Sequence, residues 1–261
     1  MTEKKLFDLS GKVVLITGGG SGLGRSICEV MAEFGADVAC AGRTTKKVEE
    51  TVELIKGFGT RTLAVTADVA DQAQVERMVD QSVKELGTID IVFANAGISE
   101  VGLQRIHEKP VEDWDLVMNT NLRSVFLLMR AVFPIMIKKK KGNFISMSSV
   151  GGLWPIADHE FPRLVTAYST SKAGIIMLTK LAARQYAGDN IRVNVICPGY
   201  HETPLTPPEV KEAFDAEMIP HIPLGRAAKS EEIKGLAVWL ASDASSYVTG
   251  QILVQDGGVN A

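Results

Sequence analysis

Two residues four positions apart, Tyr168 and Lys172, are the first sign of chemistry in this chain; they lie in the stretch VTAYSTSKAG. Residues 165–185 have a helical pattern, and residues at i and i+4 share one face of a helix. A free tyrosine has a pKa of about 10 and is a poor acid or base near neutrality. Because a neighbouring ammonium favours the phenolate, we expect Lys172 to lower the pKa of Tyr168 toward that of a general acid or base.

A second candidate site is the glycine-rich stretch TGGGSGLGR at 17–25. Its spacing is G-x-x-x-G-x-G, carried by Gly18, Gly22 and Gly24, and it joins an apolar run to a helical pattern. Glycine permits a tight turn and lets the backbone approach a pyrophosphate, which the N-terminus of the following helix then binds. A structural turn could also need glycine, but five glycines in the seven positions 18–24 favour a nucleotide site.

A sheet must position these groups, and short apolar runs alternate with helical patterns along the whole chain. The runs are typical of strands buried on both faces and occur at 12–17, 37–41, 62–67, 89–95, 142–148, 191–197 and 251–255. Such alternation implies a parallel sheet covered by helices on both sides. We therefore expect an α/β fold, a doubly wound Rossmann-type sheet of about seven strands in a single domain over residues 1–261.

One helix is predicted in detail, over residues 71–86. A single face of this helix carries Val75, Met78, Val79, Val83 and Leu86. Asp71 with Gln74 resembles a capping box in which Asp replaces Ser or Thr. The basic run KKKK at 138–141 follows another apolar helical stretch, where cations suit the negative end of the helix.

Composition excludes several classes of function. The chain has 261 residues, 46% of them hydrophobic, and a formal net charge of −3, so neither a strongly basic surface nor a nucleic-acid partner is expected. No apolar run approaches the roughly 18 residues of a membrane span, and the N-terminus lacks the apolar core of a signal peptide. Cys28, Cys40 and Cys197 are widely scattered, so we expect no metal site and a reducing, cytoplasmic location; Cys40 and Cys197 lie in apolar runs and are expected to be small core residues.

Several motifs in order carry a resemblance to a known family. They are T-G-x-x-x-G-x-G at 17–24, NAG at 95–97, Asn121, Ser149 and Y-x-x-x-K at 168–172, followed by RVNVICPGYHET at 192–203 and VTGQILVQDGG at 248–258. With them the chain resembles the short-chain dehydrogenase/reductase family over about residues 11–258. The resemblance implies a nicotinamide-dependent oxidoreductase with a small-molecule substrate, assembled as a homo-oligomer, either a dimer or a tetramer.

The resemblance also implies a catalytic tetrad of Asn121, Ser149, Tyr168 and Lys172. Ser149 would orient the substrate oxygen, and Tyr168 would exchange a proton with it. Lys172 would tune Tyr168 and bind the nicotinamide ribose. Asn121 would hold a water that connects Lys172 to solvent.

Two neighbours of the tetrad are weaker matches. Asn119 lies one helical step from Asn121. Ser148 precedes Ser149, but the serine of the family directly precedes a segment like VGG, which here is 150–152.

The resemblance also assigns cofactor contacts. They are Gly18, Ser21, Gly22, Leu23, Gly24, Arg43, Asp68, Val69, Asn95, Tyr168, Lys172, Pro198, Gly199 and Thr203. NAD-selective members carry an acid where Gly42 stands; here Arg43 follows, and its guanidinium suits a 2′-phosphate, so we expect NADP(H) over NAD(H). Arg43 could instead stack on adenine, and Lys46 or Lys47 could be solvated helix charges. His201 departs from the usual aliphatic residue beside the nicotinamide.

The segment between Ser149 and Tyr168 is longer than the common form of the family. It carries Trp154, Asp158, His159, Glu160, Phe161 and Arg163. Longer segments recur among relatives that act on sugars, sugar acids and polyols, so we expect a secondary alcohol or ketone, with a polyhydroxy substrate favoured.

Other readings of that segment stay open. Its charges could be merely solvated, and Trp154 and Phe161 could floor a pocket for a cyclic or aromatic ketone. His159 is not expected to bind a metal, since no second histidine or cysteine stands at ligand spacing. A non-catalytic, cofactor-binding regulator is the remote alternative, which the intact tetrad disfavours.

Overall fold

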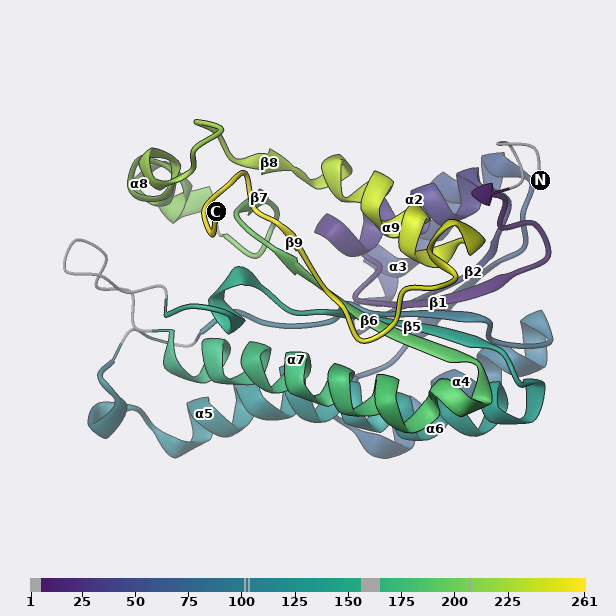
Figure 1. Cartoon of the computed structure of the whole chain (residues 1–261). Helices are drawn as coiled ribbons and strands as arrows, with labels where there is room; N and C mark the ends of the chain where they lie inside the picture. The colour runs from purple at the N-terminus through teal and green to yellow at the C-terminus, as the bar shows by residue number, and fades with distance from the viewer. Residues whose placement is uncertain (1–5, 101, 103, 156–164, 207) are drawn as a thin grey trace.

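The computed structural model of the protein describes residues 6–100, 102, 104–155, 165–206 and 208–261. Helices cover both faces of one large sheet, and α8 (Pro208–Met218) projects at one end beside the C-terminus (Figure 1). The expected three-layer α/β architecture is therefore confirmed, as a single domain.

Seven strands form the sheet, all parallel, in the order β3-β2-β1-β4-β5-β6-β9. They are β1 Val13–Thr17, β2 Asp37–Gly42, β3 Thr62–Thr66, β4 Ile91–Ala94, β5 Gly142–Met147, β6 Ile191–Pro198 and β9 Ile252–Gln255. Each predicted run matches one of these strands to within two residues at either end. The strand order reverses between β1 and β4, and ligands of open parallel sheets bind outside the carboxyl ends of the strands at such a point.

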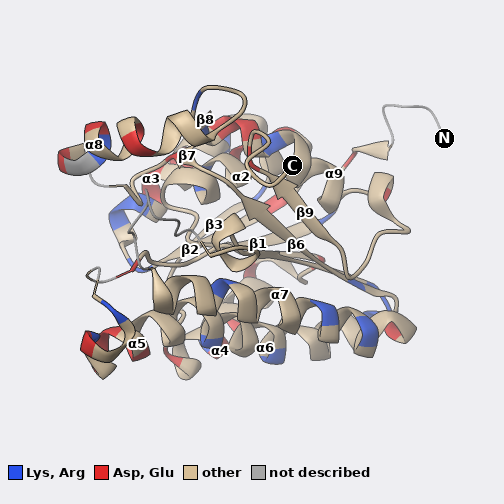
Figure 2. Cartoon of the chain, turned by 60° about the vertical axis from the view of Figure 1, so that its left-hand side comes forward, with Lys and Arg blue, Asp and Glu red and all other residues tan. Residues whose placement is uncertain are grey.

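Two layers of helices sandwich this sheet (Figure 1). One layer contains α4 Gln72–Leu86, α5 Val111–Met118, α6 Ser124–Lys139 and α7 Thr166–Tyr186. The other contains α2 Gly22–Glu33, α3 Thr45–Ile55 and α9 Lys234–Ala241. Charged residues of both signs stud the outer surfaces of these helices (Figure 2).

Each strand contributes side chains to the hydrophobic cores on both faces of the sheet. In β1, Val13 and Leu15 belong to the core under α4, α6 and α7, whereas Val14 and Ile16 belong to the core under α2, α3 and α9. All four are 0–2% exposed. Burying a side chain of this size contributes roughly 1.5–3 kcal/mol, which explains why the strands read as nearly continuous apolar runs.

One helical run has the length and hydropathy to cross a membrane. It extends over Val111–Lys139 and includes α5 and α6, and 56% of its most apolar window is buried inside the fold. The buried side chains of α6, among them Val125, Leu128 and Val132, belong to the hydrophobic core. The apolar character of this run therefore follows from its place as a core helix.

The predicted capping box of α4 is only half present. Asp71 accepts a hydrogen bond from the backbone N–H of Gln74 at 2.9 Å, as expected. The side chain of Gln74 does not accept the backbone N–H of Asp71, as a capping box requires: that N–H donates to the carbonyl of Asp68 at 3.2 Å, and Gln74 Oε1 accepts the N–H of Asp68 at 3.0 Å. The glutamine therefore fastens the loop after β3, next to a predicted cofactor contact.

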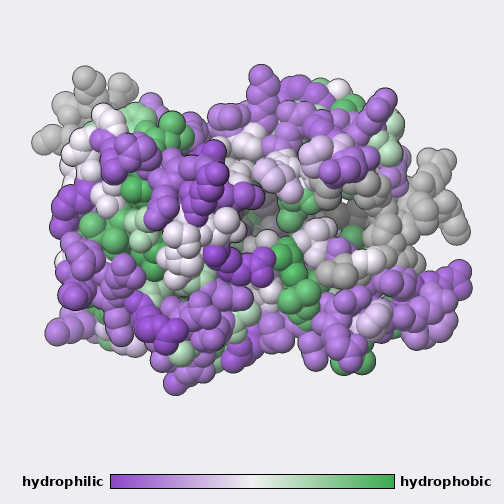
Figure 3. All heavy atoms as spheres, turned by 180° about the vertical axis from the view of Figure 1, so that it is seen from behind, coloured by the Kyte–Doolittle hydropathy of each residue, from purple (hydrophilic) through white to green (hydrophobic). Residues whose placement is uncertain are grey.

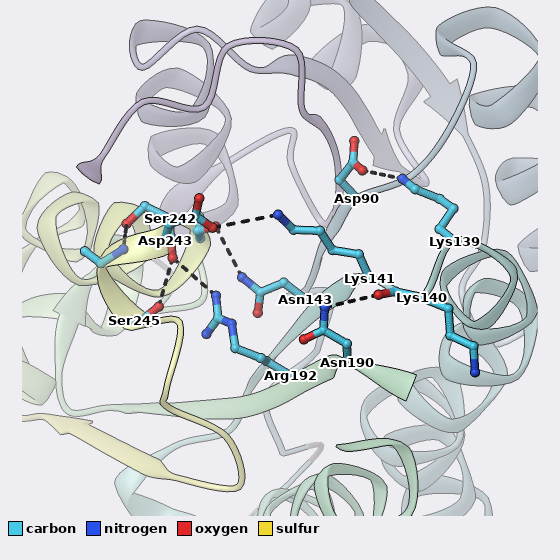
Figure 4. Close-up of polar contacts among 12 residues, drawn as sticks. Asp90, Lys139, Lys140, Lys141, Asn143, Asn190, Arg192, Ser242, Asp243 and Ser245 are labelled. Atoms are coloured by element: carbon cyan, nitrogen blue, oxygen red, sulfur yellow. Dashed lines mark hydrogen bonds and ion pairs between the residues drawn. The ribbon is translucent and has the colours of Figure 1, made fainter. Parts of the chain in front are cut away.

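The basic run at 138–141 behaves as the end of a helix. Lys140 ends α6 in a left-handed conformation with φ 52° and forms an ion pair with Asp189 at 2.8 Å. Lys139 pairs with Asp90, whose carboxylate also accepts the N–H of Val13 at 2.9 Å (Figure 4). These contacts tie together the edge of the sheet at which its strands begin.

Two cysteines that are distant in the sequence meet in the fold. Cys28 of α2 and Cys40 of β2 are both buried and lie under Gly19, where an added Cβ would approach their sulfurs to 2.9 and 2.6 Å. Burial, together with a hydrogen bond to Cys40, raises the pKa of Cys28. Both thiols are small core residues, as expected for Cys40, and they are neighbours in space.

Candidate active site

A cavity of about 630 Å³ opens at the carboxyl ends of the strands, and a second of about 180 Å³ adjoins it. The two share the lining residues Gly18, Ser21, Lys47, Ala96, Gly97 and Ile98. Seen from behind, this side of the molecule is visibly hollowed (Figure 3). The cavities therefore lie where the reversal of strand order predicts a ligand.

The glycine loop forms the wall between the two cavities. Gly18 and Gly22 have φ of 68° and 51°, a region that favours glycine. A Cβ on Gly24 would lie 2.2 Å from the carbonyl oxygen of Gly18, so no side chain fits there. Helix α2 begins at Gly22, so its first N–H groups face the larger cavity, as the binding of a pyrophosphate requires.

Asn95 braces this loop from the end of β4. Its Nδ2 donates to the carbonyl oxygen of Thr17 at 3.0 Å, and its backbone N–H donates to Thr17 Oγ1 at 3.1 Å. Ala96 N–H donates to the same hydroxyl at 3.2 Å. Thr17 therefore joins the NAG motif to the glycine loop, a role that the sequence motifs did not reveal.

Two cations border the smaller cavity. Arg43 and Lys47 line it, both exposed, and Val69 lines it from the loop after β3. None of the described residues that line this cavity is acidic. Two cations without a described carboxylate favour an anionic group in this cavity.

Asp68, a predicted adenine contact, lines neither cavity. Its Oδ1 accepts the N–H of Ala70 at 2.9 Å, and its own N–H is held by Gln74. The carboxylate thus shapes the loop that presents Val69 to the cavity.

The turn after β6 closes the larger cavity opposite the glycine loop. Pro198, Gly199 and Thr203 line it, and a Cβ on Gly22 would lie 3.2 Å from the Cβ of Thr203. His201 belongs to the short strand β7 (His201–Glu202), which pairs with β8 (Ala228–Lys229). His201 is 6% exposed and its Nδ1 lies 3.1 Å from the carbonyl oxygen of Gly199, so this departure from the usual residue stiffens the turn.

Ser149, Tyr168 and Lys172 meet in the larger cavity. Ser149 follows β5, and Tyr168 and Lys172 lie one helical turn apart in the first half of α7. A hydrogen bond links the side chains of Ser149 and Tyr168. Lys172 donates to the carbonyl oxygen of Met147 at 3.0 Å, and its Nζ lies 5.5 Å from the centre of the Tyr168 ring.

The expected lowering of the Tyr168 pKa by Lys172 is wrong for this structure. Burial raises the pKa of Tyr168, and the hydrogen bond from Ser149 offsets only part of that rise. Burial also lowers the pKa of Lys172, to about 8. The Lys172 amine is bound to the Met147 carbonyl and desolvated, and desolvation is the largest cause of both pKa shifts.

Asn121 lies behind the cavity and lines neither pocket. It is fully buried in a π-helical turn, Asn119–Arg123, that joins α5 to α6; such turns frequently mark functional sites. Its Oδ1 accepts the N–H of Ile98 at 2.8 Å, and its Nδ2 donates to the carbonyl of Ile98 at 3.0 Å and to Ser171 Oγ at 3.2 Å. The side chain therefore clamps the NAG loop.

The weaker matches occupy different places. Asn119 is exposed. Ser148 donates its hydroxyl to the carbonyl of Lys172 at 2.8 Å and so fastens α7 to β5. Both observations agree with the choice of Asn121 and Ser149.

Glu100 was not among the predicted residues, yet it lines the larger cavity. Its carboxylate accepts the backbone N–H groups of Ala167 and Tyr168 at 3.3 and 2.6 Å. It also pairs with Lys109 at 2.6 Å. The only available signal was its position, three residues after the NAG motif at the carboxyl end of a strand.

Most of the long segment before α7 lies outside the described residues, including Asp158, His159, Glu160, Phe161 and Arg163. Trp154 is described and is 61% exposed, and it lines neither cavity. The alternative in which Trp154 helps to floor the pocket is therefore not borne out for this residue, whereas Phe161 lies outside the described residues.

Comparison with known proteins agrees with this geometry. A family profile described as "Enoyl-(Acyl carrier protein) reductase" matches residues 18–260. The 3-oxoacyl-[acyl-carrier-protein] reductase of Thermotoga maritima is 39% identical over 252 residues, which cover 96% of this chain and 98% of that protein.

Solved structures match equally well. A short-chain dehydrogenase/reductase from Mycobacterium marinum superposes with a TM-score of 0.92 at 40% identity and 98% coverage of both chains. A gluconate 5-dehydrogenase from Burkholderia cenocepacia, in complex with NADP and tartrate, has a TM-score of 0.89 at 33% identity, again with 98% of both chains covered.

Fold, site and relatives together define an oxidoreductase built on a nicotinamide-binding sheet. The chain belongs to the short-chain dehydrogenase/reductase family.

Proposed function

We propose that this protein interconverts a ketone and a secondary alcohol with NADP(H) as the cofactor. The observation that carries the proposal is one cavity in which the glycine loop and the Ser149, Tyr168 and Lys172 side chains face each other. A binding-only protein would have no chemical need for this set, which supports an enzyme over a regulator.

The proposed chemistry divides between the cofactor and the chain. A bound reduced nicotinamide supplies hydride, and the glycine loop, Arg43 and the turn after β6 would hold it. Ser149 donates a hydrogen bond to the substrate oxygen. Tyr168 delivers its proton to that oxygen in reduction and takes it back in oxidation.

The raised pKa of Tyr168 suits the reductive direction, because it keeps the phenol protonated and ready to donate. With a pKa of about 8, Lys172 can change its protonation near neutrality and replace the proton of Tyr168. The water-holding role expected of Asn121 stays a prediction, since its side chain is occupied by Ile98 and Ser171.

The choice of NADP(H) rests on the smaller cavity. Arg43 and Lys47 border it, and no described lining residue would repel a 2′-phosphate. In Arg43→Ala we expect kcat/KM for NADPH to fall at least tenfold while that for NADH changes little. A wild type that prefers NADH, and keeps this preference in the variant, would contradict the proposal.

The wall of the substrate end favours an apolar ketone. It includes Val150, Val165, Leu205, Phe214 and Met218. The hydroxyl of Tyr200, also in this wall, is already bound to Asp215. Such a wall suits a ring or chain without hydroxyls, since these five described lining residues offer no polar side chain to a sugar.

A polyhydroxy substrate is the second candidate. The similarity to a gluconate 5-dehydrogenase supports it. So does the length of the segment between Ser149 and Tyr168, most of which lies outside the described residues.

The test is a panel of cyclic ketones, aromatic ketones, 3-oxo thioesters and keto-sugars, with NADPH oxidation followed by absorbance. We expect turnover of an apolar ketone, and a loss of about 10²- to 10⁴-fold in Tyr168→Phe with unchanged binding of NADPH. Turnover confined to keto-sugars would select the second candidate. Near-normal turnover in Tyr168→Phe would refute the mechanism itself.

We further propose a cytoplasmic homo-oligomer. β9 is an edge strand of the sheet. Val254 on that strand and Val259 after it are 43% and 39% exposed, so a second copy could cover this apolar edge.

A further inference from the structure

A buried ion pair lies beside the active site, outside the tetrad. Glu100 and Lys109 meet at 2.6 Å, and their side chains are 1% and 3% exposed. Glu100 follows the NAG loop, and Lys109 lies between a short 3-10 turn, Ile106–Glu108, and helix α5. Burying two charges is costly unless their geometry is good and their remaining hydrogen-bonding groups are satisfied. The backbone groups that this buried pair contacts therefore matter to its role.

The carboxylate of Glu100 holds the start of the catalytic helix. Its Oε2 accepts the N–H of Tyr168 at 2.6 Å, and its Oε1 accepts the N–H of Ala167 at 3.3 Å. The first N–H groups of a helix have no partner within the helix, and the N-cap residue Val165 supplies no side-chain cap. A negative charge is also favourable at this end of the helix dipole.

Both oxygens of Glu100 are occupied by these contacts. Oε1 contacts Lys109 and Ala167, and Oε2 contacts Tyr168. Although Glu100 lines the cavity, its carboxylate is thus directed at protein groups. This distinguishes it from a catalytic acid, which must present an oxygen or a proton to the substrate.

The same segment is clamped from the other side by the tetrad. Asn121 binds both the N–H and the carbonyl of Ile98, two residues before Glu100. Asn121 also donates to Ser171, whose hydroxyl donates to the carbonyl of Tyr168 at 2.6 Å. The backbone of Tyr168 is therefore held at its N–H through Glu100 and at its carbonyl through Ser171, and both contacts lead back to the NAG loop.

We propose that Glu100 is a positioning residue that fixes the backbone of Tyr168, with Lys109 holding the carboxylate in place. The inference rests on the proposed function, because Tyr168 is assigned there as the proton donor. A displacement of about 1 Å of a reacting group can lower a rate by about 10²-fold, so the first turn of α7 must not fray.

The test compares two variants in which both charges are removed, so that neither leaves a buried charge alone. Glu100→Gln/Lys109→Met keeps an amide oxygen that can accept the Tyr168 N–H, whereas Glu100→Leu/Lys109→Met keeps none. We expect kcat within about threefold of the wild type in the first variant. In the second we expect kcat to fall by about 10- to 100-fold with an unchanged Kd for NADPH.

The control is an ion pair at the opposite end of the sheet, where β1 and β4 begin. Asp90 pairs with Lys139 (Figure 4) and accepts the N–H of Val13 at 2.9 Å, a less buried arrangement of the same three groups: carboxylate, lysine and backbone amide. Asp90→Leu/Lys139→Met should lower the melting temperature and leave kcat unchanged. An equal loss of kcat in the control would show that Glu100 affects kcat only through stability, and would overturn the proposal.

A readout independent of activity is hydrogen–deuterium exchange of the peptide that contains residues 166–169. Its amides should exchange faster in Glu100→Leu/Lys109→Met and keep their protection in the amide variant. Equal exchange in both would overturn the clamp. If no carbonyl substrate is turned over, or Tyr168→Phe is fully active, the proposed function fails, while the exchange data still decide whether Glu100 holds α7.

A milder variant covers the case in which the apolar pair does not fold. Glu100→Asp keeps the charge and shortens the reach by one methylene group. We expect kcat to fall by about tenfold, by the same positional argument, with the Kd for NADPH unchanged. Full activity in Glu100→Asp, together with wild-type protection of 166–169, would contradict the positioning role.

Discussion

Replacing Lys172 by methionine should make the protein more stable while it abolishes activity. Lys172 is 5% exposed, and burial lowers its pKa from 10.5 to about 8. At about 1.4 kcal/mol per unit, keeping this buried amine protonated at pH 7 costs about 3 kcal/mol. Methionine loses the hydrogen bond from the charged amine to the Met147 carbonyl, worth about 2 kcal/mol, so the net gain in the free energy of unfolding is about 1 kcal/mol.

The stability difference between Lys172→Met and the wild type should depend on pH. Below pH 8 the amine is protonated in the folded and unfolded states alike, so the full penalty applies to the wild type. Between pH 8 and 10.5 the unfolded state binds the proton and the folded state does not, so the stability of the wild type rises with pH. The advantage of Lys172→Met should therefore shrink by up to about 1.4 kcal/mol per pH unit in this window.

The assay is urea unfolding at pH 7.0 and 9.5, at about the same protein concentration throughout because oligomers gain stability by mass action. Lys180→Met is the control, since Lys180 is an exposed residue of the same helix. It should show neither the gain nor the pH dependence. If Lys172→Met is less stable than the wild type at neutral pH, or its advantage does not change with pH, the burial argument is wrong.

Three further outcomes are expected. Ser149→Ala should lower kcat by about 10²-fold because it loses a donor to the substrate oxygen. Ser148→Ala should instead lower the free energy of unfolding by about 1 kcal/mol, with a smaller loss of kcat. Steady-state kinetics and urea unfolding distinguish the two effects. In Gly97→Ala the new Cβ would lie 3.2 Å from Asn121 Oδ1 and 3.5 Å from Lys172 Nζ, so we expect lower kcat with little change in melting temperature. Light scattering at micromolar concentration should give a dimer or a tetramer, and a monomer would contradict the oligomer.

The parts of the fold that depend on local sequence were predictable. Buried strands read as continuous apolar runs, and glycine is required where φ is positive, as at Gly18 and Gly22. The four tetrad residues could be selected because Tyr168 and Lys172 share the Y-x-x-x-K motif and Asn121 and Ser149 precede it in the order of the family. The structure brings three of them to the larger cavity and places Asn121 behind it.

The parts that depend on tertiary contacts were not predictable. The pKa of Tyr168 is set by burial among elements far away in the sequence, which the spacing to Lys172 cannot reveal. Glu100 lies 68 residues before the N–H that it accepts, and Gln74 turns from the expected cap to the loop at Asp68.

The π turn at Asn119–Arg123 limits how this protein could be shortened. A π turn contains one residue more than an α turn, and each residue of a helix advances its face by about 100°. Deleting one residue from the turn would regularise the helix but rotate α6 relative to α5 by about that angle. Either the apolar stripe of α6 would leave the core or Asn121 would swing away from Ile98. The extra residue therefore lets the apolar face of α6 pack on the core while Asn121 keeps its hydrogen bonds to Ile98.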